Sequence, residues 1–257
     1  MLNTFKSSKY EDFFFDIWIS FLILNHSIMK KFMLFSLLAI SSYSFAQESD
    51  TKKQDMNVSY YFGVGANVNS RYAIDDKLAA SGMPETVKTT PEFIFGIDYM
   101  GKKGSLDTEF ASQFFKKSNE FSTSSGSSFA IKLRGHYNFV NSAKFLFSGG
   151  LNLAYTTNDF NLYASNNQVD LNALGTSNAS YIRLRNGMFY TGPSIAFGLK
   201  KNDKVSLRLN IGYEFALITG KWKSDYAAVS NSFTENGHNR FVMGLVVYSN
   251  RTKYKKD

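Results

Sequence analysis

Seven charged or titratable side chains recur at every second position within otherwise apolar segments. They are Asp107, Glu109, Lys132, Arg134, His136, Arg208 and Glu214. A spacing of two places side chains on one face of a β-strand. Carboxylates and cations that share a buried face must pair with one another. The pattern therefore predicts an ion-paired cluster of Asp107 and Glu109 with Lys132 and Arg134, joined by Arg208 and Glu214.

The register of this cluster depends on where the chain turns between the acidic and the basic segment. With a turn near Ser122, Glu109 would lie opposite Arg134 or His136. Asp107 would then lie near His136 or Asn138. Two interpretations stay open: the cluster only satisfies the interior, or it lines a narrow gated pore.

The sequence offers little for catalysis. A nucleophile needs a base within hydrogen-bond reach, and His136 is the one His inside a strand-like segment, while His238 lies at the edge of a loop. No Cys is present and no zinc-type spacing occurs. Gly63 and Gly65 lie inside a strand-like segment and do not form a phosphate loop. We therefore expect no enzyme, no catalytic residue, no cofactor and no metal; a lipid A-modifying enzyme is the less favoured alternative.

The segment that best defines the fold is VSLRLNIGYEFAL, residues 205–217. Its apolar residues share one parity, while Arg208 and Glu214 share the other. The segment exceeds the roughly 5–6 residues usual in soluble sheets and suits the roughly 9–11 that cross a bilayer at a tilt. If the apolar face contacts lipid, Arg208 and Glu214 point into a barrel. The reverse would cost about 2–4 kcal/mol for Arg near the midplane.

Seven further segments alternate in the same way. With residues 205–217 they predict eight strands, near residues 58–68, 93–99, 106–114, 129–139, 145–155, 189–199, 205–217 and 241–247. Their connections alternate long, short, medium, short, long, short, long, at about 70–89, 101–104, 118–127, 141–142, 158–186, 201–203 and 219–237. Outer-membrane barrels have short periplasmic turns and longer outer loops. The predicted fold is all-β: an eight-stranded antiparallel up-and-down transmembrane β-barrel.

Aromatic residues support this topology because they gather at both ends of the predicted strands. The interfacial girdles are expected to contain Tyr60, Tyr99, Tyr137, Phe139 and Tyr248 at the periplasmic ends and Tyr155, Tyr190 and Tyr213 at the outer ends. Aromatic rings at both membrane interfaces are typical of membrane barrels. For about eight strands, side chains fill the lumen, so a plugged polar interior is expected.

The N-terminal region predicts secretion. Residues 29–46 combine Lys30 and Lys31, a short apolar run and a small-residue site that places cleavage between Ala46 and Gln47. This signal peptide is expected to be helical. Residues 1–28 are interpreted as an upstream extension that precedes the true start at Met29. Residues 47–56 form a flexible lead, 57–251 the barrel and 252–257 a charged tail; after cleavage the net charge is +7.

The mature chain resembles the small eight-stranded outer-membrane barrels of the OmpA/OmpX type. The resemblance rests on the SFA-Q cleavage site and the strands FYTGPSIAFGL, VSLRLNIGYEFAL and RFVMGLVVY. It is greatest to the porin-family outer membrane β-barrel domain proteins of Bacteroidota, which include PorT-like proteins. The resemblance implies insertion by the barrel-assembly machinery. One departure is that the chain continues past Tyr248 to Asp257, where relatives often end on an aromatic residue.

These observations predict a non-enzymatic protein of the cell outer membrane, with long extracellular loops for adhesion, ligand or partner contact. The alternative is a narrow porin-like channel or an accessory barrel of a secretion or uptake system. Expected partners are outer-membrane lipid and lipopolysaccharide, the barrel-assembly machinery, and an extracellular or secretion-system protein. The positive net charge favours lipopolysaccharide phosphates. No nucleic acid is expected.

Overall fold

The computed structural model describes residues 57–164 and 181–249. Several predictions lie outside these residues: the upstream extension 1–28, the signal peptide 29–46 with its Ala46–Gln47 site, the lead 47–56 and the tail 252–257. The described chain begins in the first strand and ends in the last.

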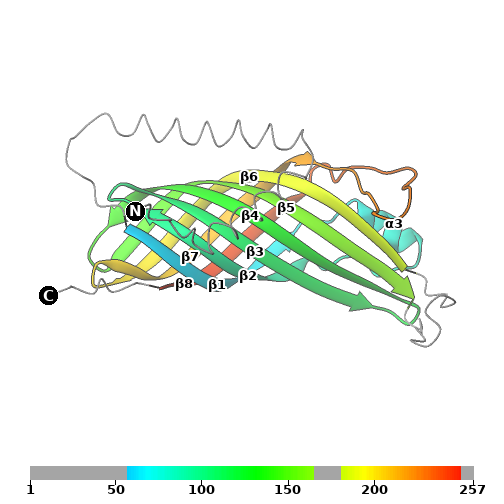
Figure 1. Ribbon diagram of the computed structural model, residues 1–257, viewed down its shortest axis with the longest axis horizontal. Helices are drawn as coiled ribbons and strands as arrows, with labels where there is room; N and C mark the ends of the chain where they lie inside the picture. The colour runs from blue at the N-terminus through cyan, green and yellow to red at the C-terminus, as the bar shows by residue number, and fades with distance from the viewer. Residues whose placement is uncertain (1–56, 165–180, 250–257) are drawn as a thin grey trace, which may run out of the picture. The chain divides into compact units, whose positions relative to one another are not determined.

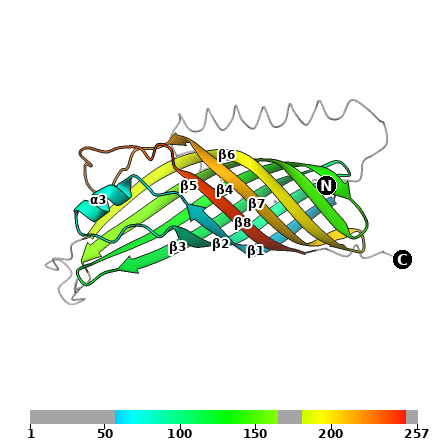
Figure 2. The same cartoon turned by 180° about the vertical axis from the view of Figure 1, so that it is seen from behind.

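Eight antiparallel strands form one closed barrel in which each strand pairs with its neighbours in sequence and β8 pairs with β1 (Figures 1 and 2). The strands are β1 (Asn57–Asn69), β2 (Thr89–Met100), β3 (Gly104–Ser118), β4 (Ser122–Asn141), β5 (Phe145–Ala164), β6 (Tyr181–Lys201), β7 (Lys204–Thr219) and β8 (Asn239–Ser249). The predicted eight-stranded up-and-down barrel is confirmed. Because the barrel is closed, each of the eight strands pairs on both sides and presents no free edge.

The barrel has the polarity of a membrane protein. Phe62 and Phe93 on the outer face are each 60% exposed, whereas Arg208 on the inner face is 0% exposed. An apolar outer surface around a polar interior is stable only where hydrocarbon is the outer solvent. The chain is therefore an outer-membrane-type β-barrel. Within the described residues, no helix is both long and apolar enough to cross a membrane.

Three neighbouring strands are longer than the membrane requires. β4 and β5 each have 20 residues and β6 has 21, against roughly 9–11 for a tilted span. The wall thus continues past the lipid at one end of the barrel. The prediction of a medium loop near residues 118–127 is wrong, because β3 and β4 continue to a short turn over residues 119–121. The expected loop at 158–186 is also partly wrong: its ends belong to β5 and β6, and its centre lies outside the described residues.

The first long connection, expected as a polar loop, contains the short helix α3 (Ile74–Ala80). Figures 1 and 2 both show α3 beside the β7–β8 connection at the same end of the barrel. An apolar cluster lies here, formed by Tyr72, Ile74, Leu78, Ala154, Phe160, Leu162, Met188, Tyr190 and Trp222. We call this cluster, with α3 and residues 219–238, the outer cap. It closes the barrel mouth opposite the end where β1 begins and β8 ends.

The segment 205–217 departs from simple alternation at each end. The β6–β7 pairing shifts between Leu199 and Lys200 and again between Phe189 and Tyr190. The first shift turns Val205 inward, where it is 4% exposed instead of facing lipid as expected. The second leaves Leu217 and Ile218 both exposed, at 61% and 53%. Each bulge offsets the alternation by one residue.

Candidate functional site

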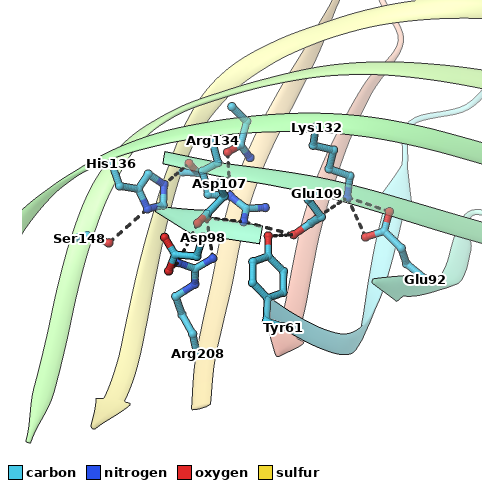
Figure 3. A network of polar contacts seen from close by, with 12 residues as sticks. Tyr61, Glu92, Asp98, Asp107, Glu109, Lys132, Arg134, His136, Ser148 and Arg208 are labelled. Carbon is cyan, nitrogen blue, oxygen red and sulfur yellow. Dashed lines mark hydrogen bonds and ion pairs between the residues drawn. The ribbon is translucent and has the colours of Figure 1, made fainter. Parts of the chain in front are cut away.

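The candidate site is the charged lumen, which Figure 3 shows from close by. Arg208 on β7 is fully buried here, and it donates from Nη1 to Asp98 Oδ2 at 3.2 Å and from Nη2 to Asp107 Oδ2 at 2.5 Å. The rings of Tyr61 and Tyr248 each lie 5.3 Å from its guanidinium carbon. Tyr248 also donates to Asp98 at 2.8 Å. Residues on four strands therefore hold the Arg208 guanidinium, two through charge pairing and two through cation–π contact.

Arg134 on β4 connects this layer to the next. Its Nη1 donates to Asp107 Oδ2 and to Glu109 Oε2, each at 3.3 Å. Its Nε donates to Asn152 Oδ1 at 3.0 Å. Tyr61 donates to the same Glu109 oxygen at 3.2 Å. Asp107 thus lies between Arg134 and Arg208, so the two layers share a carboxylate.

Lys132 forms the next layer with two carboxylates. Its Nζ lies 2.8 Å from both oxygens of Glu92 and 3.2 Å from Glu109 Oε1. Glu92 Oε1 also accepts from Asn67 at 3.1 Å and from Gln113 at 3.2 Å. This carboxylate therefore has partners on β1, β3 and β4, which satisfies its charge without water.

A fourth layer lies beneath the outer cap. Arg240 on β8 donates from Nε to Glu214 Oε2 at 2.7 Å, and its guanidinium carbon lies 3.9 Å from the centre of the Tyr190 ring. Asn152 donates to the other Glu214 oxygen at 3.3 Å. Since Asn152 also accepts from Arg134, it links the Glu214–Arg240 pair to the central layers.

His136 lies at the end of the network away from the outer cap and does not contact a carboxylate. Its Nδ1 is 3.2 Å from Ser148 Oγ and its Nε2 is 2.6 Å from Ser194 Oγ. The residue is 5% exposed. Two hydroxyls thus satisfy both ring nitrogens, and the site resembles a packed hydrogen-bonded interior more than an accessible nucleophile–base pair.

The network leaves very little open space. It comprises five carboxylates and four cations, each at most 3% exposed: Glu92, Asp98, Asp107, Glu109 and Glu214, and Lys132, Arg134, Arg208 and Arg240. A void is lined by Glu92, Lys132 and Arg134. The centre of a water molecule can occupy about 10 Å³ of it. That is about the room for one water. The observed lumen is a packed plug rather than an open channel.

The structure buries all seven side chains of the predicted lumen set, but it changes their register. Asp107 lies opposite Arg134 and Glu109 opposite Lys132, two or four positions from the two predicted pairings. The cause is the turn at residues 119–121, which comes before the assumed turn near Ser122. Glu214 pairs with Arg240 instead of joining the Asp107 cluster directly.

Sequence reasoning missed several members of the network. Glu92 and Asp98 share the inward parity of β2, and Arg240 shares that of β8. Tyr61 likewise lies inward between two outward neighbours on β1. The signal was available, because each residue alternates with a lipid-facing aromatic or aliphatic residue.

The expected aromatic girdles need two corrections. Tyr190 is 0% exposed and Tyr248 is 6% exposed, so both face the lumen instead of the membrane interface. Their parity is opposite to that of the outward Phe189 and Val247. In the lumen their hydroxyls contact His238 and Asp98. Tyr60, Tyr137, Phe139 and Tyr213 are exposed on the outer surface, at 50%, 55%, 61% and 42%, and Tyr99 and Tyr155 are partly exposed.

In the outer cap, one carboxylate ties two connections together. Glu235 accepts from Trp222 Nε1 at 2.7 Å, from Ile74 N at 3.0 Å and from Ala73 N. Burial raises the pKa of Glu235, although these donors oppose the shift. Loop residues 219–238 are thereby fastened to the start of α3.

His238, expected at a loop edge as a satisfied or surface residue, is buried in the same cap. Its ring stacks on Tyr72 with 4.0 Å between centroids, and Nδ1 lies 2.9 Å from the Tyr190 hydroxyl. Burial, with the nearby charge of Arg240, lowers its pKa to about 3. The ring is therefore neutral at physiological pH. Among the described residues, no three His, Cys, Asp or Glu side chains are grouped to hold a metal.

Comparison with solved structures finds outer membrane proteins of low sequence identity. OprG from Pseudomonas aeruginosa is 15% identical with a TM-score of 0.42, covering 78% of this chain and 99% of that protein. A major outer membrane protein from Thermus thermophilus is 8% identical with a TM-score of 0.42, covering 75% and 99%. Ail of Yersinia pestis, solved with the heparin analogue sucrose octasulfate, is 9% identical with a TM-score of 0.39, covering 76% and 99%.

No family model matches the chain, and no curated protein matches it. The assignment to outer-membrane-type barrels therefore rests on the closed ladder, the lipid-facing surface and the charged lumen described above.

Proposed function

We propose that this protein is a non-enzymatic barrel of the outer membrane whose lumen is a structural plug and whose activity lies on its outer end. The observation that carries this proposal is the continuous lumen network. Arg134, Arg208 and Arg240 each contact a buried carboxylate, and strands on every side of the lumen supply the partners. Moving an ion through this layer would require breaking several desolvated charge pairs at once.

The cap supports the same interpretation, because it closes the barrel above the network. Trp222 is 1% exposed and packs on Phe160 with 5.0 Å between ring centroids. The long strands β4 to β6 instead present a wall beyond the lipid. Contact with an extracellular or secretion-system partner would therefore use this wall and the cap surface, while the barrel-assembly machinery inserts the chain.

Planar-bilayer recording of the protein without its signal peptide tests the plug. We expect no steady conductance, and heat-modifiable mobility on a gel verifies that the sample is a folded barrel. In a Trp222→Ala background, which opens the cap, Lys132→Ala/Arg134→Ala should conduct because it empties the centre of the lumen. In the same background, Lys102→Ala/Lys103→Ala changes two lysines in the β2–β3 turn and should stay closed. A steady native conductance that disappears on neutralising Arg134 would instead establish a narrow channel.

The non-enzymatic part has its own test. Lipid A from a strain that lacks the protein is compared with the parent by mass spectrometry. We expect identical lipid A species, because His136 contacts two buried serines within a closed lumen. A species present only in the parent strain would contradict the proposal and favour a lipid A-modifying enzyme.

A further inference from the structure

Four cations gather on the outer wall just beyond the lipid-facing surface. They are Arg183 and Arg185 on β6 and Lys221 and Lys223 in the β7–β8 connection, and we call them the outer cation patch. The two segments are held together by reciprocal backbone hydrogen bonds between Arg185 and Lys223, at 2.7 and 2.9 Å. Figures 1 and 2 show this connection running along the end of β6.

All four side chains belong to the outer face of the wall. Arg183 and Arg185 share the parity of the lipid-side Phe189, and their side chains are 40% and 45% exposed. Lys221 and Lys223 flank Trp222, which points inward and is 1% exposed. Neighbours on either side of an inward residue point outward in extended chain. Both lysines are exposed.

The patch lies within side-chain reach of the lipid headgroups. Phe189 pairs with Ile218, which is 53% exposed on the lipid side. Arg185 lies four residues farther along β6, which at about 3.3 Å per residue and a tilt of about 35–45° is about 10 Å higher. The interfacial layer beyond the hydrocarbon is about 5–7 Å thick on each side. Long Lys and Arg side chains bridge the difference by bending toward the interface.

The charges of the patch are only partly compensated. Asp159 lies 3.2 Å from Arg183 Nη2 and 3.0 Å from Arg185 Nε, and Asp225 lies 3.0 Å from Arg185 Nη1. Lys221 and Lys223 have no acidic partner among the described residues. Exposed pairs of this kind add little stability. They do hold the two guanidiniums in place, while their remaining N–H groups and both ammonium groups stay available.

We propose that the outer cation patch binds the phosphate groups of an anionic glycolipid in the outer leaflet. Its positive excess, its outward orientation and its height match a phosphate carried at the membrane surface. Guanidinium groups bind phosphate oxygens through paired hydrogen bonds, and ammonium groups add charge. Tyr181 and Tyr226 stack with 6.3 Å between centroids above the patch and offer ring faces to sugar. The inference rests on the proposed insertion with the outer cap facing outward.

Native mass spectrometry of the folded barrel with added diphosphoryl lipid A tests this site. We expect bound diphosphoryl lipid A on the native protein, and about thirtyfold weaker binding by Lys221→Gln/Lys223→Gln because two cations are lost. The matched variant Lys102→Gln/Lys103→Gln removes the same charge at the opposite end and should bind as the native protein does. Arg183→Gln/Arg185→Gln should weaken binding at least as much, and salt should weaken binding to the native protein.

Three results would overturn the site. They are equal binding of dephosphorylated lipid A, equal loss in the control variant, or binding of soluble heparin that excludes lipid A, which would point to a polysaccharide ligand. Failure of the proposed function can be distinguished from failure of this lipid site, because it would appear as conductance or as a missing gel shift in the native protein. Heat-modifiable mobility of every variant verifies that lost binding reflects lost cations in a folded barrel.

Discussion

The middle of the barrel and its outer cap are both closed, but by opposite means. In the middle, rigid strands hold charges such as Arg208 and Asp107 in a shared network. In the cap, Trp222 and Phe160 exclude water, and two connections pack against the ends of β5 and β6. The middle of the lumen is closed by side chains that the strand register brings together. This part of the lumen therefore cannot open without loosening the barrel. The cap depends on loop contacts and can open while the barrel stays intact.

Removing Arg208 should break the middle most severely. Arg208→Ala leaves the buried Asp98 without a cation and leaves Asp107 with Arg134 alone, which should destabilise the barrel by about 3–5 kcal/mol. Urea unfolding in lipid, followed by the loss of heat-modifiable mobility, measures this. Arg71→Ala is the matched control: its pairs with Asp76 and Glu85 are exposed, and it should change stability by less than about 1 kcal/mol. Equal stability of native and Arg208→Ala protein would refute the account of the middle.

Removing Trp222 should open the cap alone. Trp222→Ala deletes a ring that is 1% exposed and a hydrogen bond to Glu235, at a local cost of about 3 kcal/mol. We expect rapid protease cleavage within residues 219–238, while the boiled and unboiled gel bands stay as in the native protein. A barrel that unfolds together with its cap would show that the two regions are one cooperative unit.

A smaller disturbance of the middle comes from Gly96. A Cβ atom added there would lie 2.3 Å from Tyr61 Cζ, so the ring would have to leave its place beside Arg208 and Glu109. Gly96→Ala should cost about 1–3 kcal/mol in urea unfolding. Gly135→Ala provides the control, because nothing lies within 4 Å of its added Cβ. Equal stability of the two variants would mean that Tyr61 is not tightly held.

The smallest expected effect is a pH response confined to the cap. Because burial lowers the His238 pKa from its usual 6.5 to about 3, the folded cap disfavours the protonated ring. The contribution of the neutral His238 ring to the stability of the cap is fully present above pH 6.5 and is lost as the pH falls toward 3. Between pH 7 and 5.5 the cap should lose about 1 kcal/mol. Fluorescence of Trp222, the one Trp after residue 46, measures cap opening.

The control for this response is His238→Gln, which cannot titrate. The raised pKa of Glu235 acts in the opposite sense, since its protonation favours the folded cap as the pH falls. The difference between native and His238→Gln therefore isolates the His contribution. Identical pH profiles would show that His238 does not control the cap.

Alternation along each strand was enough to place Asp107, Lys132 and Arg208 inside the barrel. The same rule places Tyr190 and Tyr248 inside as well, whereas their position near strand ends suggests girdles, and the structure follows the alternation. Which charged side chains pair across neighbouring strands was less predictable. The chain reverses earlier than expected, so Asp107 lies opposite Arg134 instead of near His136 or Asn138, because every pair in a hairpin depends on where the chain reverses.

Sequence by itself determined the strand number, the polarity of the barrel and the charged character of its lumen, because those properties follow from a local period of two. Only the tertiary structure decided which partners Glu92, Asp98 and Arg240 meet in the network, that Val205 turns inward at a bulge, and that α3 and Trp222 close the mouth. These depend on the register and closure of strands distant in the chain. The ring of eight strands sets which side chains meet across the lumen, and no local pattern records those distances.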